Sequence, residues 1–381
     1  MKTPAHPAAM PLPRSDKTPA TVAFFTGSAG DWGGASRVLF ANLRLLDRDR
    51  IEPIVLLPRN GPIVPELRAR GIACEIWGDL TEPGQPLGYL KAMLRMARFL
   101  RRHRVDAIHV NHSNSWRPAE LLAAWLMRVP ILTHYHTVND APAPFIALSK
   151  GIVAVSHYVA QHSRPGHVPK HVIHNPVDLA RFDAARDIRA ELGYGPDEVL
   201  VSFLGQVREI KGVGDFIAMA KRLPHPHARF LIAGECRDPE KFTGSYSEAS
   251  LAAAFGGDTR LRYLGYLDRV EDLYRASDVV VVPSRWQEPL GLINLEAGAC
   301  RTPVVATRSG GIPEIVVDGE NGFLVDIGDV AALANRVQRL IDDGALRARM
   351  GEAGRARVEA EFTTKPVREL EKLLLSLRTD K

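Results

Sequence analysis

The chain has 381 residues, of which 45% are hydrophobic and 24% are charged, so it has the composition of a globular protein with two or three domains. No apolar stretch reaches the roughly 18 residues that span a bilayer, which excludes an integral membrane protein. The formal net charge of +5 is mild and suits an anionic substrate or membrane surface without requiring a nucleic acid.

The cysteines and the first residues indicate the cellular setting. Cys74, Cys236 and Cys300 lie far apart and form no CxxC pair. An odd number of scattered cysteines argues against a disulfide framework and a cysteine metal site, so we expect a reducing, cytoplasmic location. Residues 1–20 are rich in proline and alanine and lack the apolar core of a secretory signal, so we expect a disordered leader.

Short apolar runs alternate with helical patterns through the first half of the chain. Several runs are almost wholly apolar, which is typical of strands buried on both faces of a parallel sheet. We expect strands at 21–26, 53–57, 73–77, 107–111, 131–136, 152–156 and 172–174, and helices at 35–46, 87–102 and 118–127.

The second half repeats this alternation beyond a weakly patterned stretch at 175–197. It predicts right-handed βαβ units in both halves, and therefore two doubly wound parallel sheets in domains at 21–180 and 181–363. Ligands of such sheets bind outside the carboxyl ends of the strands, so the natural site is the cleft between the domains. We expect strands at 199–204, 229–233, 261–265, 279–282, 304–307 and 322–325, and helices at 213–223, 270–276, 290–299 and 330–341.

A glycine-rich loop at 27–34 joins the first strand to the first helix. Glycines there let the backbone approach a ligand closely. The spacing matches neither the dinucleotide-binding fingerprint nor a Walker loop, and a tight turn between strand and helix explains it equally well.

The stretch at 89–104 mixes Leu, Met and Phe with several basic residues. A basic amphipathic helix of this kind can lie on an anionic membrane surface, but a packed helix with a solvated basic face explains the pattern as well. Nucleic-acid binding would require interleaved aromatic residues or a known motif, and neither is present. The basic residues are Lys91, Arg95, Arg98, Arg101, Arg102 and Arg104.

Four histidines, His109, His112, His134 and His136, lie near the ends of two expected strands. His134 and His136 share one face of a strand, so a zinc site must be considered. No cysteine or H-E-x-x-H pattern supports one. The D-x-D sequence at 47–49 follows a helix rather than a buried strand, so we expect no essential metal.

Two segments of the second half suit a phosphorylated sugar. Lys211 lies at a turn before a helix, where a lysine can neutralise a diphosphate, although the pattern alone favours a solvated loop lysine. Glu288 precedes Pro289, which we expect at the first position of a helix whose unpaired amides at 290–292 can receive a phosphate. The carboxylates of Glu288 and Glu296 can accept hydroxyl hydrogen bonds, but spacing alone allows ordinary helix charges as well.

Residues 288–296 resemble the E-x7-E motif of the family 4 retaining glycosyltransferases, which have the GT-B fold of two Rossmann-like domains. The turns at 310–315 and 318–325 are similar to the rest of that signature, in the same order along the chain. The resemblance extends over nearly the whole folded chain and favours functional roles for both glutamates. It also implies that the C-terminal helix, at 364–381, crosses back to the first domain.

The resemblance implies roles for individual residues. Glu288 would contact the donor sugar, Glu296 the nucleotide ribose and Lys211 the departing diphosphate, while His136 matches a histidine that contacts the donor sugar. Gln206 replaces the family's usual arginine, so either one cation suffices or Arg208 supplies the second. The other implied contacts are Gly33, Gly34, Leu290, Gly291 and Leu292 for the donor, and Asp31, Asn111 and His112 for the acceptor.

The implied reaction is transfer of a sugar from a UDP- or GDP-sugar to an acceptor hydroxyl, with retention and without cofactor or metal. We expect a glycan or lipid-linked acceptor, a role in surface polysaccharide or glycolipid synthesis, and peripheral attachment to the inner face of a membrane. Two alternatives remain open. A sugar-nucleotide epimerase would need further acid–base groups, which the sequence does not reveal, and a non-catalytic carbohydrate or lipid binder would need none of the charged residues.

Overall fold

The computed structural model describes residues 18–28, 33–78, 86–112 and 118–380. The expected leader at 1–20 lies almost entirely outside these ranges, and so does Asp31.

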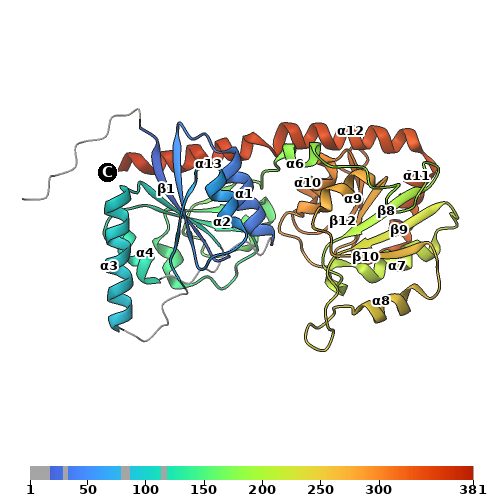
Figure 1. Cartoon of the computed structure of the whole chain (residues 1–381), viewed down its shortest axis with the longest axis horizontal. Coiled ribbons are helices and arrows are strands. Elements are labelled where there is room, and N and C mark those ends of the chain that lie inside the picture. Colours follow the sequence, from blue (N-terminus) through green and yellow to red (C-terminus); the bar gives the residue numbers. More distant parts are fainter. Residues whose placement is uncertain (1–17, 29–32, 79–85, 113–117, 381) are drawn as a thin grey trace, which may run out of the picture.

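Two parallel sheets, one from each half of the chain, face each other across a cleft (Figure 1). Their strand orders are β3-β2-β1-β4-β5-β6-β7 and β10-β9-β8-β11-β12-β13, so each begins in the middle, winds to one edge and returns to the other. The strands of the first are β1 (Ala20–Thr26), β2 (Ile51–Leu57), β3 (Ala73–Ile76), β4 (Ala107–Asn111), β5 (Ile131–Tyr135), β6 (Gly151–Ala154) and β7 (Lys170–Val172). Those of the second are β8 (Val199–Leu204), β9 (Ala228–Ala233), β10 (Leu261–Gly265), β11 (Val279–Val282), β12 (Val304–Thr307) and β13 (Gly322–Val325).

Helices cover both faces of each sheet, and the buried apolar residues show which helix covers which face. α1, α2 and α13 pack on one face of the first sheet, and α3 and α4 on the other. α7, α8 and α11 cover one face of the second sheet, and α9, α10 and α12 the other. The bounds are α1 (Gly34–Leu45), α2 (Ile63–Ala69), α3 (Pro86–His103), α4 (Pro118–Leu126), α5 (His157–His162), α6 (Leu179–Asp183), α7 (Val213–Arg222), α8 (Glu248–Phe255), α9 (Val270–Ala276), α10 (Leu292–Ala299), α11 (Val330–Asp342), α12 (Gly344–Glu361) and α13 (Thr364–Ser376).

The last two helices run along both domains, and α13 lies against the first (Figure 1). Val367, Leu370 and Leu374 bury themselves against α1 and the first sheet. Glu371, which is fully buried, accepts hydrogen bonds from the amide of Asp47 and the guanidinium of Arg50. Apolar burial and the hydrogen bonds of the Glu371 carboxylate therefore hold α13 on the first domain.

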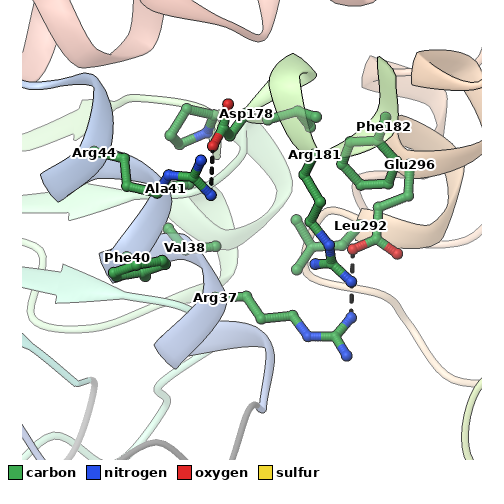
Figure 2. A pocket seen from close by; sticks show the side chains of 12 residues that line it. Arg37, Val38, Phe40, Ala41, Arg44, Asp178, Arg181, Phe182, Leu292 and Glu296 are labelled. Atoms are coloured by element: carbon green, nitrogen blue, oxygen red, sulfur yellow. Dashed lines mark hydrogen bonds and ion pairs between the residues drawn. The ribbon is translucent and has the colours of Figure 1, made fainter. Parts of the chain in front are cut away.

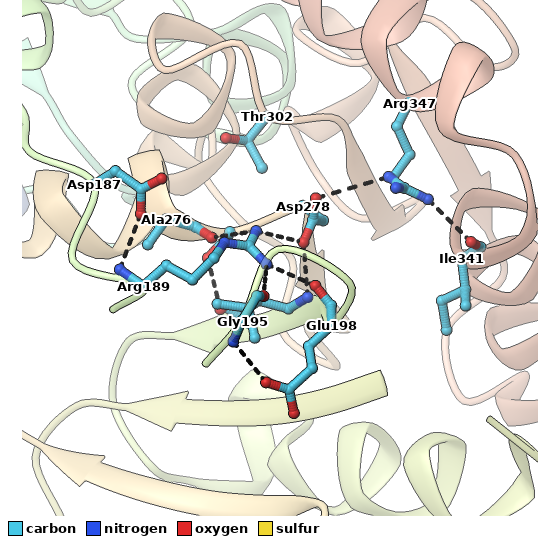
Figure 3. Close-up of polar contacts among 12 residues, drawn as sticks. Asp187, Arg189, Gly195, Glu198, Ala276, Asp278, Thr302, Ile341 and Arg347 are labelled. Carbon is cyan, nitrogen blue, oxygen red and sulfur yellow. Dashed lines mark hydrogen bonds and ion pairs between the residues drawn. The ribbon is translucent and has the colours of Figure 1, made fainter. Parts of the chain in front are cut away.

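An arginine holds the connection between the domains to the second sheet (Figure 3). Arg189 donates to Asp278 at 2.7 Å and to the carbonyl of Glu198 at 2.6 Å. Asp278 also accepts from the amide of Leu200 at 2.8 Å. These hydrogen bonds join the segment between the two sheets to the starts of β8 and β11. Lys211 and Glu288 lie in the turns that follow the other ends of these two strands.

The expected elements agree with the structure except at a few ends. β7 spans Lys170–Val172, two residues earlier than expected, and α10 begins at Leu292 rather than at Pro289. The periodicity did not predict α2, α5, α6 and α8, which have only five to eight residues each. The expected boundary at residue 180 falls within α6, between the two sheets.

In the described ranges, no helix combines the length and apolarity that crossing a membrane requires.

Candidate active site

A cavity of about 530 Å³ opens where the carboxyl ends of the two sheets face each other. The first domain contributes its glycine loop and the residues after β5, and the second contributes the turns after β8 and β11 and the start of α10. The lining residues are Gly34, Arg37, His136, Thr137, Asn175, Gly205, Gln206, Arg208, Ile210, Lys211, Val282, Trp286, Glu288, Pro289, Leu290, Gly291, Leu292, Ile293 and Glu296.

Lys211 and Glu288 form an ion pair at this cavity. The ammonium of Lys211 lies 2.6 Å from Glu288 Oε1 and 4.7 Å from the centre of the Trp286 ring. Ser284, which is completely buried, donates to the same carboxylate oxygen at 2.9 Å. The sequence did not single out Ser284, which lies two residues beyond the end of β11 and fixes the orientation of Glu288.

Glycines bring the two charged residues together. Gly212 has φ 77°, and a Cβ there would lie 1.8 Å from the carbonyl oxygen of Pro283. Gly310 has φ 51°, and a Cβ there would lie 2.0 Å from the carbonyl oxygen of Glu288. Only glycine permits such close backbone packing, so the turn that carries Lys211 packs on the end of β11, and the turn after β12 packs on the loop that carries Glu288.

Two side chains hold Glu296, and Figure 2 shows one of them, Arg37. The hydroxyl of Tyr274 on α9 donates to Oε2 at 2.7 Å, and the guanidinium of Arg37 on α1 lies 3.5 Å from Oε1. Burial, reinforced by the charge of Glu296 and this hydrogen bond, raises the pKa of Tyr274 well above its ordinary value. Tyr274 therefore remains a hydrogen-bond donor and fixes one oxygen of the carboxylate while the other faces the cleft.

The start of α10 differs from the expectation, for a reason that lies in the backbone. Gly291 adopts φ 88° at the N-cap, a left-handed conformation that ends the preceding loop and delays the helix to Leu292. Pro289 therefore stays in the loop, where its carbonyl accepts a hydrogen bond from Ser156 of the first domain. Among the described residues, the amides of Leu290, Gly291, Leu292 and Ile293 have no hydrogen-bond partner, so the unpaired amides that the sequence placed at 290–292 extend to residue 293.

The histidines form a connected cluster at the ends of β4 and β5. His136 Nε2 lies 3.0 Å from Asn111 Oδ1, and its ring stacks on that of His134 at 4.2 Å. His134 Nδ1 lies 3.3 Å from His109 Nε2. Burial, followed by the charges of His109 and His112, lowers the pKa of His136 to about 3, so the ring is neutral at physiological pH. In the described part of the chain, no group of three or more metal-binding side chains is arranged to hold an ion.

The remaining candidates are divided between the cavity and its surroundings. Gly34, Gln206 and Arg208 line the cavity, whereas His112 packs on Gly27 and is not among the lining residues. Gly33 precedes the first residue of α1 and also does not line the cavity, and Asp31 lies outside the described residues. Asn111, expected near the acceptor, bonds to His136 and to the carbonyl of Ala35.

Arg37 is a cavity residue that the sequence reasoning missed. It lies on the first turn of α1, three residues after Gly34, and its guanidinium crosses the cleft to Glu296 (Figure 2). A smaller hollow of about 70 Å³ beside the main cavity is also lined by Arg37 and Glu296. The position of Arg37 after the glycine loop was the available signal, but its partner is 259 residues away in sequence.

A second contact between the domains lies beside the Glu288 loop. Glu314 accepts hydrogen bonds from the amides of His157 and Tyr158 at 3.0 and 3.1 Å, and lies 2.9 Å from His174 Nε2. Burial raises the pKa of Glu314, but these hydrogen bonds outweigh burial and lower it below 4.5. The ionised carboxylate therefore connects the second glycine-rich turn to the start of α5.

Two family models and several known proteins match this chain. The model described as Glycosyltransferase Family 4 matches residues 32–181, and the one described as Glycosyl transferases group 1 matches residues 185–357. The N-acetyl-alpha-D-glucosaminyl L-malate synthase of Bacillus anthracis is 29% identical over 293 residues, which are 72% of this chain and 75% of that protein.

Solved structures share the fold. A glycosyltransferase from Rickettsia africae has a TM-score of 0.81 at 19% identity, with 95% of this chain and all of that one covered. Anabaena HepE in complex with UDP and glucose has a TM-score of 0.76 at 22% identity, with 94% and 99% covered. The chain belongs to the family 4 glycosyltransferases and has the GT-B fold.

Proposed function

We propose that this glycosyltransferase moves a hexosyl group from a UDP- or GDP-sugar to an acceptor hydroxyl, with retention at the anomeric carbon and without an essential metal ion. The observation that carries the proposal is the grouping of Lys211, Glu288 and Glu296 with the free amides of α10 around one cavity between the domains. The solved structures of HepE with UDP and with UDP-glucose favour a nucleotide-sugar ligand for this cavity.

Each group has a task that its chemistry suits. Glu296 receives the ribose hydroxyls on Oε1, because Tyr274 already occupies Oε2. The amides of Leu292 and Ile293 and the ammonium of Lys211 stabilise the diphosphate as the bond to the sugar breaks. In metal-dependent transferases a divalent cation neutralises the diphosphate. Here these fixed positive groups neutralise it, so no metal is needed.

The arrangement of the carboxylates favours one route to the retention that the family resemblance implies. Glu288 Oε1 is occupied by Lys211 and Ser284, so this carboxylate is suited to accepting a sugar hydroxyl rather than attacking the anomeric carbon. With no second carboxylate assigned opposite it, a double-displacement scheme has no nucleophile. We infer that the acceptor attacks from the face that the diphosphate leaves, and that the departing phosphate takes the acceptor proton.

Slow donor hydrolysis tests the proposal without knowledge of the acceptor. The purified protein is incubated with UDP- and GDP-sugars, and nucleotide release is followed in the wild type and in Lys211→Ala and Glu288→Ala. Release that both substitutions abolish is the expected result. Wild-type turnover and nucleotide binding in both variants would overturn the site. Accumulation of a new sugar-nucleotide would indicate an epimerase, and binding without any turnover in the presence of candidate acceptors would indicate a carbohydrate-binding protein.

We further propose that the acceptor lies at an anionic membrane surface, against the layer formed by α3 and α4. Leu87, Leu90 and Leu94 on α3 expose 74%, 53% and 46% of their surface, and Trp125 and Leu126 on α4 expose 52% and 58%. Large apolar side chains rarely gather on a free surface without a partner. A hollow of about 410 Å³ at the end of α4 continues this apolar area, lined by Trp125, Leu126, Arg128, Val129, Pro130, Leu148, Lys150 and Leu377.

The positive charge on α3 favours binding to an anionic bilayer. α3 carries Lys91, Arg95, Arg98, Arg101 and Arg102 and no acidic residue. Of the acidic residues near α3, Asp106 and Glu120 are buried, and Glu75 pairs with His103 of α3 at 3.1 Å. Apolar side chains can enter the headgroup region while each cation near the surface adds about 1 kcal/mol of attraction.

Vesicle binding tests this surface. The protein should sediment with phosphatidylcholine vesicles that contain phosphatidylglycerol, and not with pure phosphatidylcholine. The double variant Arg98→Glu/Arg102→Glu should lose this binding, whereas Arg222→Glu/Arg349→Glu, which changes the net charge equally on exposed positions of the second domain, should keep it. An equal loss of vesicle binding in both double variants would show that binding depends on net charge alone, and would contradict the assigned surface.

A further inference from the structure

We propose that Asn111 is a positioning residue that holds the His136 ring in one tautomer, with the proton on Nε2. The inference rests on the proposed function, in which His136 contacts the donor sugar. It assigns to Asn111 a task different from the acceptor contact that the sequence suggested.

The hydrogen bonds of Asn111 determine the orientation of its amide. Its Nδ2 lies 3.1 Å from the carbonyl oxygen of Ala35, and its Oδ1 lies 3.0 Å from His136 Nε2. A carbonyl oxygen only accepts, so the amide nitrogen must face Ala35 and the amide oxygen must face His136. The amide oxygen in turn only accepts, so His136 Nε2 must carry a proton.

The surroundings keep His136 neutral and fix the plane of its ring. Asn111 is 2% exposed, and the His136 ring stacks on His134 at an interplanar angle of 21°. The titratable groups around it are His134 on the same strand and His109 and His112 at the end of β4, and a proton on any of them would oppose a second proton on His136. A neutral ring with its proton on Nε2 carries an unprotonated Nδ1, a nitrogen that accepts rather than donates a hydrogen bond.

The same bridge joins His136 to the glycine loop. Ala35 directly follows Gly34, and Gly34 and His136 both line the cavity. A single side chain at the end of β4 therefore fixes the first turn of α1 relative to the residue after β5. The two backbone elements that lie over the donor are set by one buried amide.

The tautomer can be measured directly. In the folded protein with ¹⁵N-labelled histidine, we expect His136 Nε2 to show the shift of a protonated nitrogen and Nδ1 that of an unprotonated one, without change between about pH 5 and 9. In Asn111→Ala, the ring should distribute over both tautomers, and donor hydrolysis should fall by about 10- to 100-fold. A wild-type ring protonated on Nδ1 would overturn the proposal.

A charged substitute gives a second readout. Asn111→Asp places a carboxylate next to His136, which should raise the pKa of the ring and introduce a new ionisation into the pH profile of donor hydrolysis. Asn42→Asp is the matched control, because Asn42 is also buried and its amide also donates to a backbone carbonyl, that of Val38 on its own helix, at 3.0 Å. An unchanged profile in Asn111→Asp would contradict the proposal.

These results separate the inference from the proposed function. If Lys211→Ala and Glu288→Ala abolish hydrolysis while the ¹⁵N shifts show the wrong tautomer, only the role of Asn111 fails. If the tautomer is as expected but hydrolysis is absent or unaffected by those two substitutions, the proposed function fails and the positioning of the ring remains.

Discussion

The hydroxyl of Tyr274 donates to Glu296 Oε2 at 2.7 Å, from a side chain that is only 1% exposed. The tyrosine approaches from α9, beneath the helix that carries the glutamate. The orientation of Glu296 at the cavity is therefore already fixed, and its other carboxylate oxygen, Oε1, pairs with Arg37 at 3.5 Å.

Replacing Tyr274 with phenylalanine should weaken nucleotide binding while the fold is kept. The substitution leaves a buried carboxylate oxygen without its donor, which costs about 1–3 kcal/mol, so we expect the Kd for UDP or GDP to rise about tenfold. Isothermal titration calorimetry measures this. Tyr135→Phe is the control, since Tyr135 is equally buried and donates one hydrogen bond, to Arg164, in the first domain. Equal affinity in Tyr274→Phe and the wild type would show that Glu296 needs no support.

Replacing Lys211 with alanine should affect turnover more than binding. The ammonium faces the diphosphate as negative charge develops, and removal of one such group costs about 10²- to 10³-fold in kcat. Lys221→Ala removes a lysine of the same domain that donates to the carbonyl of Ala254 at 2.7 Å, outside the cavity, and should leave kcat unchanged. Comparable losses of kcat in both variants would indicate a general effect on the domain rather than on the leaving group.

The Glu314 contact should make the stability of the protein depend on pH in a defined direction. Because the pKa of Glu314 is lowered in the folded state, its contribution is complete above about 4.5 and is lost as the pH falls through the folded-state pKa. Glu314→Gln should therefore lower Tm by about 2–6 °C at pH 7, and this difference should shrink as the pH approaches 4.

Thermal unfolding at several pH values measures that difference. Glu320→Gln, which changes an exposed glutamate of the neighbouring turn, should have no comparable effect at any pH. A difference between Glu314→Gln and the wild type that grows on acidification would reverse the sign and contradict the assignment of an ionised carboxylate.

Chelation should leave transfer unchanged. In the proposed function, the groups that stabilise the diphosphate are Lys211 and the first amides of α10, all of which belong to the protein, so EDTA should not reduce nucleotide release. The measurement is donor hydrolysis with EDTA, with added Mg²⁺ and with added Mn²⁺, after dialysis. A loss of activity with EDTA that either cation restores would contradict the metal-independent mechanism.

Local pattern was sufficient for much of the site. Lys211, Glu288 and Glu296 each follow a strand or begin a helix in a pattern that places them at the carboxyl edge of a sheet, and the structure brings all three to one cavity. The partners that hold them could not be predicted, because Tyr274 and Ser284 are a tyrosine inside a helix and a serine in a loop, with no local pattern to distinguish them. The start of α10 was misplaced because proline favours the first helical position, whereas the left-handed Gly291 and the packing of Gly310 keep residues 289–291 in a loop.

The sequence by itself determined the two doubly wound parallel sheets, since alternating apolar strands and amphipathic helices leave few other ways to bury both faces of each strand. It also placed the charged residues at the edges of those sheets. The tertiary structure decided which groups meet: Arg37 reaches Glu296 across the cleft, Glu314 connects to α5, and Asn111 sets the proton on His136. These contacts join residues 25 to 259 positions apart, and only the packing of the strands within a sheet and of one domain against the other fixes the distances on which hydrogen bonds depend.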